Sequence, residues 1–535
     1  MEQQNIADQV VIVERATQED YKETDVIKRI LRDDYQQYED EAQSRNREAV
    51  LAKLNSIIKD WIREVGRSKG KDENTILNSG GKIFTFGSYR LGVHAPNTDI
   101  DALCVAPRHV DREEDFFGSL FDMLKGHQSV KNLYPVQKGF VPRIGMEFEG
   151  IEIDLIFARI QASEVGEDLK DLLDDNILKG CDDETVRSLN GTRVADILLK
   201  QVPNVENFRT TLRCVKLWAK NRGIYSNVLG YFGGIAYMIL VAKICKIFPY
   251  LEPNKLLRNF FSYCLNREWS YNNPVILVKV SDEPMYGIKD ELLYKEKNTN
   301  LMPILTPAYP CMNSTHNVSH STKEAMLAEF EKGLKITEAI LKRDERGQKQ
   351  YPSLSWKRLF KKFAFFSSFT HYIMITICSI DDELHSRWLG FVESKLRFFV
   401  SALEKLTSQK TYAVEFRPWP KSYTIQSTLT QVDDEYSYTK SDSYFIGMRI
   451  KRNETVEMVT VDLTQTIQKY YESLAQWIHD QQPDCEEAAG LKHVDVQIRY
   501  VGQEGLPEDV KPKMIGKRKE REDQEVDERQ ELDYE

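Results

Sequence analysis

The stretch from Phe84 to Cys104 reads FTFGSYRLGVHAPNTDIDALC and decides the fold of the region around it. An apolar strand pattern runs into Gly87-Ser88, which is predicted to open a short helix and to point N–H groups and a hydroxyl at an anion such as a triphosphate. A plain turn is the alternative for this pair taken alone. A second apolar strand pattern begins at Asp99-Ile100-Asp101. Residues i and i+2 of a strand project from one face, so Asp99 and Asp101 are predicted to lie together.

A third carboxylate is expected to join this pair. Asp154 lies in the apolar run IEIDLIF, where a charged group needs a partner or a metal to offset its lost hydration. Like charges this close also need a hard cation such as Mg²⁺. Three carboxylates from two strands can hold two ions about 3.5–4 Å apart, one activating a hydroxyl and one steadying a leaving phosphate. A solvated strand end is the alternative for Asp99 and Asp101 taken alone.

Around this stretch the sequence predicts a mixed sheet flanked by helices. Apolar side chains recur at three- and four-residue steps between Thr17 and Lys69, which predicts helix packing on the next unit. Short runs of β-branched or aromatic residues predict the strands Lys82–Phe86, Ile100–Ala106, Arg143–Phe148 and Ile151–Phe157.

Two further regions follow along the chain. Long periodic segments such as Phe208–Asn221 and Gly233–Phe248 predict a largely helical region. After Tyr351 the predicted order is β-α-β-β-α-β, that of a ferredoxin-like or split βαβ unit. Its predicted elements are His371–Ser379, Asp381–Leu406, Ala413–Trp419, Ser443–Arg452, Leu463–His479 and Val494–Val501. The polar tail Lys511–Glu535 is predicted to be disordered.

The composition is that of several ordinary folded domains. Of 535 residues, 41% are apolar and 29% charged, which excludes collagen-like and disordered classes. The net charge of −10 means that nucleic-acid affinity must come from local basic patches. Eight scattered cysteines without a C-x-x-C pair argue against a zinc site and favour a reducing compartment. No secretory signal is evident, and the apolar stretch Tyr231–Cys245 is too short to cross a bilayer.

The sequence resembles the nuclear poly(A) polymerases of eukaryotes, within the polymerase-β-like nucleotidyltransferase superfamily, from about residue 17 to 505. The motifs that carry the resemblance are GSYRLGVHAPNTDIDALCVAPRHV, GIEIDLIFARI, SLNGTRV, KLWAKNRGIYSNVLGYFGGIAY and MPILTPAYPCMNSTHNV. It implies an α+β multidomain chain with a nucleotidyltransferase palm (17–204), a helical central domain (205–350), a ferredoxin-like or RRM-like RNA-binding domain (351–505) and a disordered charged tail (506–535).

The resemblance implies template-independent addition of AMP from ATP to RNA 3′ ends, as in pre-mRNA polyadenylation, with two Mg²⁺ or Mn²⁺ ions. Asp99, Asp101 and Asp154 resemble the family's catalytic, metal-binding and ATP-binding triad, with Asp154 accepting the proton of the primer 3′-hydroxyl. The other nucleotide contacts it implies are Phe86, Gly87, Ser88, Ala95, Ile100, Lys216, Tyr225, Asn227, Gly234 and Ile235, with Asn190 and Thr306 as further candidates. Ile235 replaces the valine more usual in the family.

Structural alternatives accompany several of these residues. Lys216 lies on a helix pattern rich in lysine and arginine, so a solvated basic face competes with a triphosphate contact. Tyr225 can instead pack in a core. The basic and aromatic segment 356–363 suits either an RNA groove or an amphipathic helix with snorkelling lysines. His316 and His320 have a ligand-like spacing but no evident third ligand.

Two other functions stay open at this point: another terminal nucleotidyltransferase, such as a uridylyltransferase, and a catalytically silent RNA-binding subunit. The missing RNP1 pattern predicts backbone contacts to RNA with little sequence choice. The resemblance implies RNA 3′ ends, ATP and cleavage and polyadenylation factors as partners, no membrane, and a monomer within a larger complex. It also implies a nuclear location, for which Lys517–Arg521 is a candidate import signal.

Overall fold

The computed structural model describes residues 11–278, 285–288, 300–408, 413–425, 431–433, 436–451, 462–481 and 494–512. Most of the charged tail, with the basic cluster Lys517–Arg521, lies outside the described residues. The chain divides into two compact units. The first comprises Met1–Trp218, Gly233–Ser314 and Phe330–Phe360, and the second Ala219–Phe232, Thr315–Glu329 and Lys361–Glu535.

The N-terminal helical region is interrupted, so the prediction of one helical run from Thr17 to Lys69 is wrong in its middle. Helix α1 (Gln18–Arg29) continues into a π-helical turn (Ile30–Asp34), and α2 begins only at Glu41 and ends at Ser68. Gln36 adopts a left-handed φ of 49° between them. Asp40 then starts α2 with a capping box, which ends the interruption.

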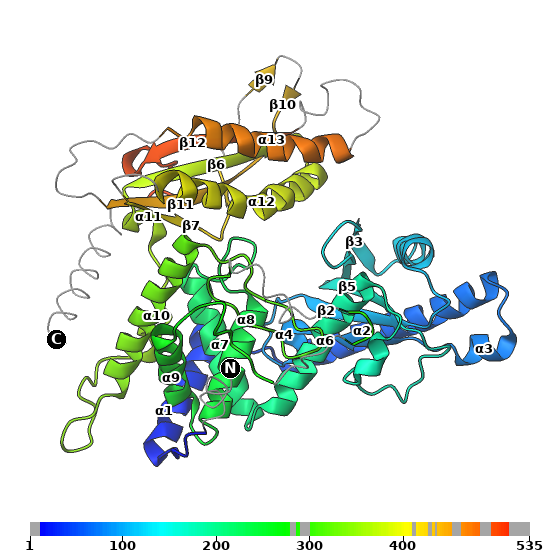
Figure 1. Cartoon of the computed structure of the whole chain (residues 1–535), viewed down its shortest axis with the longest axis horizontal. Coiled ribbons are helices and arrows are strands. Elements are labelled where there is room, and N and C mark those ends of the chain that lie inside the picture. The colour runs from blue at the N-terminus through cyan, green and yellow to red at the C-terminus, as the bar shows by residue number, and fades with distance from the viewer. Residues whose placement is uncertain are drawn as a thin grey trace. The chain divides into compact units, whose positions relative to one another are not determined.

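The palm sheet of the first unit is mixed, as predicted, and has one strand more than predicted. Its strands are β1 (Lys82–Thr85), β2 (Ile100–Ala106), β3 (Val130–Val136), β4 (Arg143–Phe148) and β5 (Ile151–Arg159). They lie in the order β1-β2-β5-β4-β3, with β2 and β5 parallel and the other pairs antiparallel. The strand missing from the prediction is β3, which forms one edge of the sheet (Figure 1).

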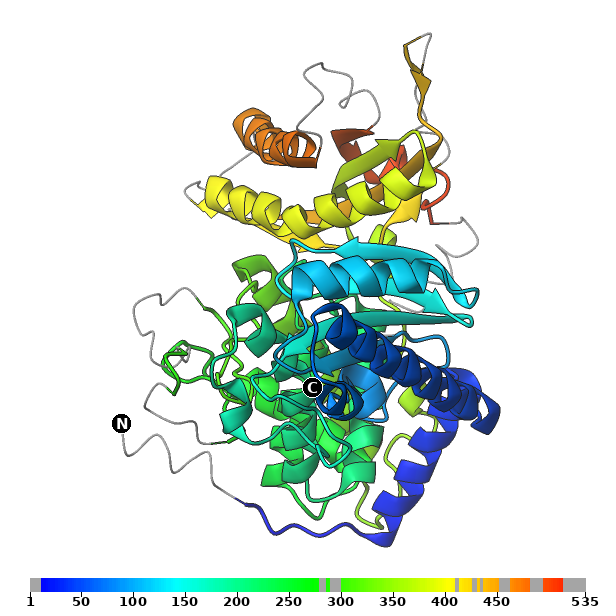
Figure 2. The same ribbon diagram turned by 90° about the vertical axis from the view of Figure 1, so that its right-hand side faces the viewer.

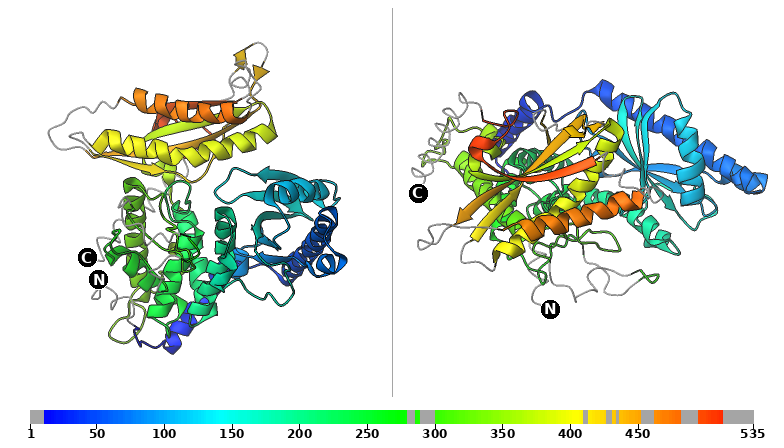
Figure 3. Two further views of the ribbon diagram at one scale, coloured as in Figure 1. Left: turned by 45° about the vertical axis from the view of Figure 1, so that its right-hand side comes forward. Right: turned by 90° about the horizontal axis from the view of Figure 1, so that it is seen from above.

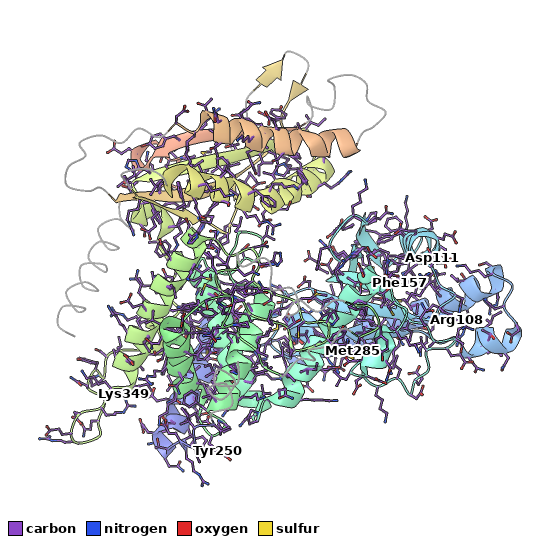
Figure 4. The ribbon with its side chains drawn as sticks, viewed as in Figure 1. Arg108, Asp111, Phe157, Tyr250, Met285 and Lys349 are labelled. Atoms are coloured by element: carbon purple, nitrogen blue, oxygen red, sulfur yellow. The ribbon has the colours of Figure 1, made fainter. Side chains whose placement is uncertain are left out.

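The two faces of the palm sheet bury different side chains. Helix α2 covers one face of the sheet (Figure 2). Its Leu54 and Trp61 join the buried cluster on that face, which also contains Phe157, labelled in Figure 4. Helix α6 (Asp183–Gln201) packs Leu189 against the opposite face, beside Leu103 of β2. Asp101 and Asp154 have the same parity in their strands as the α6-facing residues, so they project from that face. Short helices α3 (Glu73–Asn78), α4 (Gly87–Arg90), the π-helix Arg112–Leu120 and α5 (Phe121–Lys125) complete the palm.

The rest of the first unit is built on helices, as the periodic segments predict. These are α7 (Val205–Arg222), α8 (Gly234–Ile247), α9 (Pro253–Asn266) and α10 (His320–Leu341). Residues 219–222 of α7 and 320–329 of α10 belong to the second unit. Trp218 stacks on Phe330 at 5.7 Å and meets Phe261 edge-on at 4.8 Å between ring centroids, which locks three of these helices together. No helix among the described residues is long and apolar enough to span a membrane.

The second unit contains the predicted split βαβ arrangement. Strands β6 (His371–Ser379), β7 (Ala413–Pro418), β11 (Lys440–Lys451) and β12 (Val494–Gly502) form an antiparallel sheet in the order β12-β6-β11-β7. Helices α12 (Asp382–Ser408) and α13 (Thr464–Gln481) pack against each other (Figure 3). Short strands β8 (Tyr423–Thr424), β9 (Gln431–Asp433) and β10 (Tyr436–Ser437) are additions to the predicted order.

Part of this sheet is covered from within the chain. Helix α11 (Phe365–Ser368) joins Tyr372, Met374 and Phe445 of the sheet in one buried cluster. The Tyr372 hydroxyl donates to the carbonyls of Phe365 and Phe369. These positions therefore cannot present their rings to RNA bases in the way of an RRM with an RNP motif.

The basic and aromatic segment 356–363 is not the amphipathic helix considered from the sequence, because only Trp356–Arg358 form a short 3₁₀ helix. Trp356 begins a three-residue 3₁₀ helix and is buried, with its indole N–H donated to Glu23 at 2.9 Å. Phe363 belongs to the second unit, where the Arg417 guanidinium lies 3.9 Å from its ring centroid. Arg417 and Arg222 both pair with the buried Glu329, at 3.1 and 2.6 Å. Trp356 and Phe363 therefore serve packing within each unit.

Candidate active site

Three carboxylates converge at the start of β2 and β5. Asp101 and Asp154 are direct partners in the parallel pairing of these strands, and Asp99 precedes β2. One oxygen of each carboxylate lies within 4.8 Å of the others. This is the juxtaposition that the alternation of β-strand side chains predicts. Among the described residues it is also the only group of three or more His, Cys, Asp or Glu side chains arranged to share a metal ion, so His316 and His320 join no such group.

The surroundings of Asp101 and Asp154 disfavour the charged forms of their carboxyl groups. Burial raises the pKa of Asp101 to about 7, and the neighbouring carboxylates of Asp99 and Asp154 add to the shift, against the charge of Lys216. Burial also raises the pKa of Asp154. Perturbed carboxylates of this kind gather at functional sites. A divalent cation bound by hard oxygen ligands would relieve both the repulsion and the lost hydration.

Arg143 is a functional neighbour that the sequence analysis missed. It begins β4, next to β5, and its Nε donates to Asp154 Oδ1 at 3.2 Å. Its charge lowers the pKa of Asp154, against the effect of burial. The signal lies in the two-residue turn Glu149–Gly150, whose left-handed φ values join β4 and β5 as a tight hairpin. Counting back from that turn places Gly145 opposite Asp154, and Arg143 two residues before Gly145 on the same face of the sheet.

The Gly-Ser turn lies against the carboxylates. Gly87 has a left-handed φ of 61°, and a Cβ built on it would lie 2.1 Å from Asp101 Oδ2. Only glycine satisfies both the backbone conformation and this close approach. The Phe86 N–H donates to the Asp101 carbonyl at 3.1 Å, which ties the turn to β2. Ser88 follows in the first turn of α4.

Cations on α7 hold the loop that follows this turn. Arg209 Nε, Arg213 Nη2 and Lys216 Nζ donate to the successive carbonyls of residues 91, 92 and 93, at 2.9, 2.5 and 3.3 Å. The interpretation of this helix face as merely solvated is therefore wrong. Lys216 also acts on the charge of Asp101. It is thus the member of the three that faces the carboxylates.

The remaining predicted contacts in the first unit surround α4. The ring of Phe86 lies against Gly191 of α6, where a Cβ would come within 2.9 Å of it. The Ala95 N–H donates to the Thr98 hydroxyl, and Ile100 is buried at the start of β2. Gly234 and Ile235 form the first turn of α8, a helix that packs against α4.

Two further candidates in this unit differ in character. Asn190 is buried on α6, and its Oδ1 accepts no hydrogen bond from the described residues, although Nδ2 donates to the Pro310 carbonyl at 3.4 Å. A buried acceptor without a donor is a place where a ligand can bind. Thr306 instead accepts from the Met312 N–H at 3.0 Å, which closes a local turn.

Tyr225 and Asn227 belong to the second unit. Tyr225 is half-buried, and Lys220 Nζ lies 5.4 Å from its ring centroid. The Asn227 carbonyl accepts from Asn317 Nδ2 at 3.0 Å. Its side-chain Oδ1 is buried and, like that of Asn190, has no hydrogen-bond donor among the described residues.

Three family models match the chain in succession. The nucleotidyltransferase domain of poly(A) polymerase matches residues 9–202, its central domain 207–362 and its predicted RNA binding domain 364–442. The chain belongs to the poly(A) polymerase family. The family's nucleotidyltransferase domain is therefore the one that carries the three carboxylates.

Individual relatives agree with this membership. The chain is 40% identical to a poly(A) polymerase of Dictyostelium discoideum over 89% of its own length and 55% of the relative's. It is 40% identical to nuclear poly(A) polymerase 1 of Arabidopsis thaliana, over 81% of this chain and 57% of that one. The chain thus spans about half the length of these curated relatives. Among solved structures, one of the Cid1 poly(U) polymerase matches 65% of this chain and 100% of its own, with 13% identity and a TM-score of 0.41.

Proposed function

We propose that this chain is a polynucleotide adenylyltransferase that adds AMP from ATP to the 3′ end of RNA without a template. The observation that carries the proposal is the register of β2 and β5, which pairs Asp101 with Asp154 beside Asp99 and the Gly87 turn. This arrangement occurs in a chain whose family is that of the poly(A) polymerases. The domain boundaries at 204, 350 and 505 stay predictions from the sequence.

The three carboxylates fit a pair of divalent cations such as Mg²⁺ or Mn²⁺. They offer only hard oxygen donors within 4.8 Å of one another, and burial together with the neighbouring carboxylates raises the pKa of Asp101. Bound there, two cations would neutralise charge on the attacking hydroxyl and on the leaving phosphate. Asp99, Asp101 and Asp154 would hold them.

The chemistry left to the side chains is positioning and proton transfer. The primer 3′-oxygen forms a bond to the α-phosphorus of ATP as the bond from that phosphorus to the β-phosphate oxygen breaks, and pyrophosphate leaves. The hydroxyl proton passes to Asp154, which lies opposite Asp101 in the pairing of β2 and β5. Before this transfer, Arg143 balances the negative charge of Asp154 from β4.

The ATP contacts that we propose are those implied by the resemblance to the family. Gly87 and Ser88 would present backbone N–H groups and a hydroxyl to the phosphates, and Lys216 would add a positive charge. The other residues proposed to line the nucleotide are Phe86, Ala95, Ile100, Tyr225, Asn227, Gly234 and Ile235. Among the further candidates, the orphan amide oxygen of Asn190 supports a contact to a base amino group, whereas the local hydrogen bond of Thr306 favours a structural role.

The proposal also covers RNA binding, location in the cell and assembly. The second unit would contact the RNA backbone, since its family model is that of an RNA-binding domain. A nuclear location and recruitment by cleavage and polyadenylation factors are proposed because several relatives are named nuclear poly(A) polymerases. A monomer within a larger complex is the assembly proposed.

Primer extension tests this proposal. The full chain is incubated with a labelled RNA, Mg²⁺ or Mn²⁺, and each of the four nucleoside triphosphates separately. Extension with ATP alone is expected. Extension with UTP alone would replace the proposal by a uridylyltransferase, and RNA binding without extension by any nucleotide would favour a silent RNA-binding subunit.

A further inference from the structure

Tyr134 lies in one row with the catalytic carboxylates across the palm sheet. The pairing registers place Tyr134 of β3 opposite Gly145 of β4, Gly145 opposite Asp154 of β5, and Asp154 opposite Asp101 of β2. Directly paired residues project from the same face of a sheet. Tyr134 therefore shares the face of the carboxylates, and it is 49% exposed there.

A β-bulge sets this orientation. Lys131 pairs with Glu147 and Tyr134 with Gly145, so three steps along β3 match two along β4. The extra residue is accommodated at Asn132, which has a left-handed φ of 49°. Without the bulge, the preceding residue, Leu133, would face the carboxylates, whereas it packs against the opposite core. Bulges beside active sites commonly redirect one side chain in this way.

Gly145 leaves the space that the Tyr134 ring occupies. A Cβ built on Gly145 would lie 2.4 Å from Tyr134 Cζ and 2.6 Å from its hydroxyl oxygen. The ring thus lies across the backbone of β4 and toward Asp154. Arg143, two residues before Gly145 on the same face, donates to Asp154 and is 38% exposed. The Tyr134 ring over Gly145 and the Arg143 guanidinium thus both lie on the β4 side of Asp154.

In-line phosphoryl transfer divides the site into two sides. The attacking and leaving oxygens lie opposite each other across the phosphorus. The Gly87–Ser88 turn follows β1, and Lys216 reaches the loop after that turn, so the triphosphate side of the carboxylates is that of β1. The nucleophile then arrives from the other side, over β4 and β3, where Tyr134 and Arg143 lie.

We propose that Tyr134 stacks on the base of the 3′-terminal nucleotide of the RNA, and that Arg143 contacts the phosphate of that nucleotide. Stacking on an aromatic ring accepts any base, which suits an enzyme that must extend varied ends. Tyr134 would hold the terminal ribose so that its 3′-hydroxyl points at Asp154. This inference rests on the proposed function, because it assigns the primer side of that site.

A double-mutant cycle, in which the Tyr134 ring and the terminal base of the RNA are removed singly and together, tests the inference by RNA binding alone. Fluorescence anisotropy measures the affinity of the full chain, in EDTA, for an oligoadenylate and for the same RNA with an abasic ribose at its 3′ end. The wild type should bind the intact end between about 5-fold and 100-fold more tightly. Tyr134→Ala should bind both RNAs equally, whereas Tyr134→Phe, which keeps the ring, should still discriminate between them.

Controls separate this effect from loss of structure. Tyr21 is 48% exposed on α1, so Tyr21→Ala is a matched loss of an exposed tyrosine and should discriminate as the wild type does. Equal binding of both RNAs by the wild type, or undiminished discrimination by Tyr134→Ala, would overturn the inference. The inference would also be overturned if Tyr134→Ala raised the KM for ATP rather than the KM for RNA in the extension assay. Failure of the wild type to extend RNA with ATP would instead count against the proposed function, and the binding cycle does not depend on it.

Discussion

Replacing Asp101 with Asn should stabilise the protein when divalent cations are removed. In the native protein, burial and two neighbouring carboxylates make the charged form of Asp101 unfavourable. Asparagine keeps the shape of the side chain but carries no charge at any pH. The variant therefore loses activity and gains stability, a combination expected of a residue kept for binding a metal rather than for folding.

The size of the effect follows from the pKa. Raising it from 3.8 to about 7 means that, between these pH values, the unfolded chain has released a proton that the native protein retains. Stability contributed by protonated Asp101 is complete below pH 3.8, falls as pH rises, and is gone above about pH 7. About three pH units at 1.36 kcal/mol each give roughly 4 kcal/mol. Above pH 7, Asp101→Asn should exceed the wild type by about that amount.

Thermal unfolding followed by circular dichroism in EDTA provides the assay. The Tm difference between Asp101→Asn and the wild type should be small near pH 4, should grow up to about pH 7 and should then stay constant. Adding Mg²⁺ should raise the Tm of the wild type and reduce the difference, because ligand binding stabilises only the form that binds. A variant that is no more stable than the wild type at pH 8 in EDTA would refute the reasoning.

Three other substitutions have defined outcomes. Lys216→Ala should raise the KM for ATP about 10- to 100-fold through loss of a charge-assisted contact, with primer KM unchanged, and equal ATP kinetics would leave Lys216 a structural residue. Gly87→Ala should lower kcat at least tenfold, because the added Cβ would displace Asp101. Gly150 also has a left-handed φ but has open space around it, so the control variant Gly150→Ala should lose only stability. Equal rates for the two variants would contradict this expectation. Glu329→Leu should destabilise the second unit by about 3–5 kcal/mol, because the buried Arg417 and the half-buried Arg222 lose the carboxylate that they share, and an unchanged Tm would contradict this expectation.

The sequence predicts that Asp99 and Asp101 lie together, because this depends only on the alternation of side chains within one strand. Alternation within β2 places Asp99 and Asp101 on one face. The partner Asp154 was identified as a charge in an apolar run, and its place opposite Asp101 follows once β2 and β5 pair in parallel. Arg143 was missed because its role depends on a neighbouring strand, although the Glu149–Gly150 turn fixes that register.

The interruptions of regular structure were harder to predict. Residues 30–40 contain neither glycine nor proline, so nothing marked the end of the first helix before Asp40. Strand β3 contains Pro135 and the bulge at Asn132, which together break the alternation by which strands are recognised. The face of the sheet from which Tyr134 projects depends on that bulge, so only the structure reveals it. For Tyr225 and Asn227, the sequence supports a nucleotide role through family resemblance alone.

If Asp99, Asp101 and Asp154 perform adenylyl transfer, the rate of a single addition of AMP depends on each of them. Wild type, Asp101→Ala and Asp154→Ala are each saturated with labelled RNA, ATP and Mg²⁺ are added, and the first AMP addition is timed. We predict rapid addition by the wild type and rates at least about 1,000-fold lower in both variants, with RNA affinity unchanged. Addition by either variant at the rate of the wild type would contradict the account.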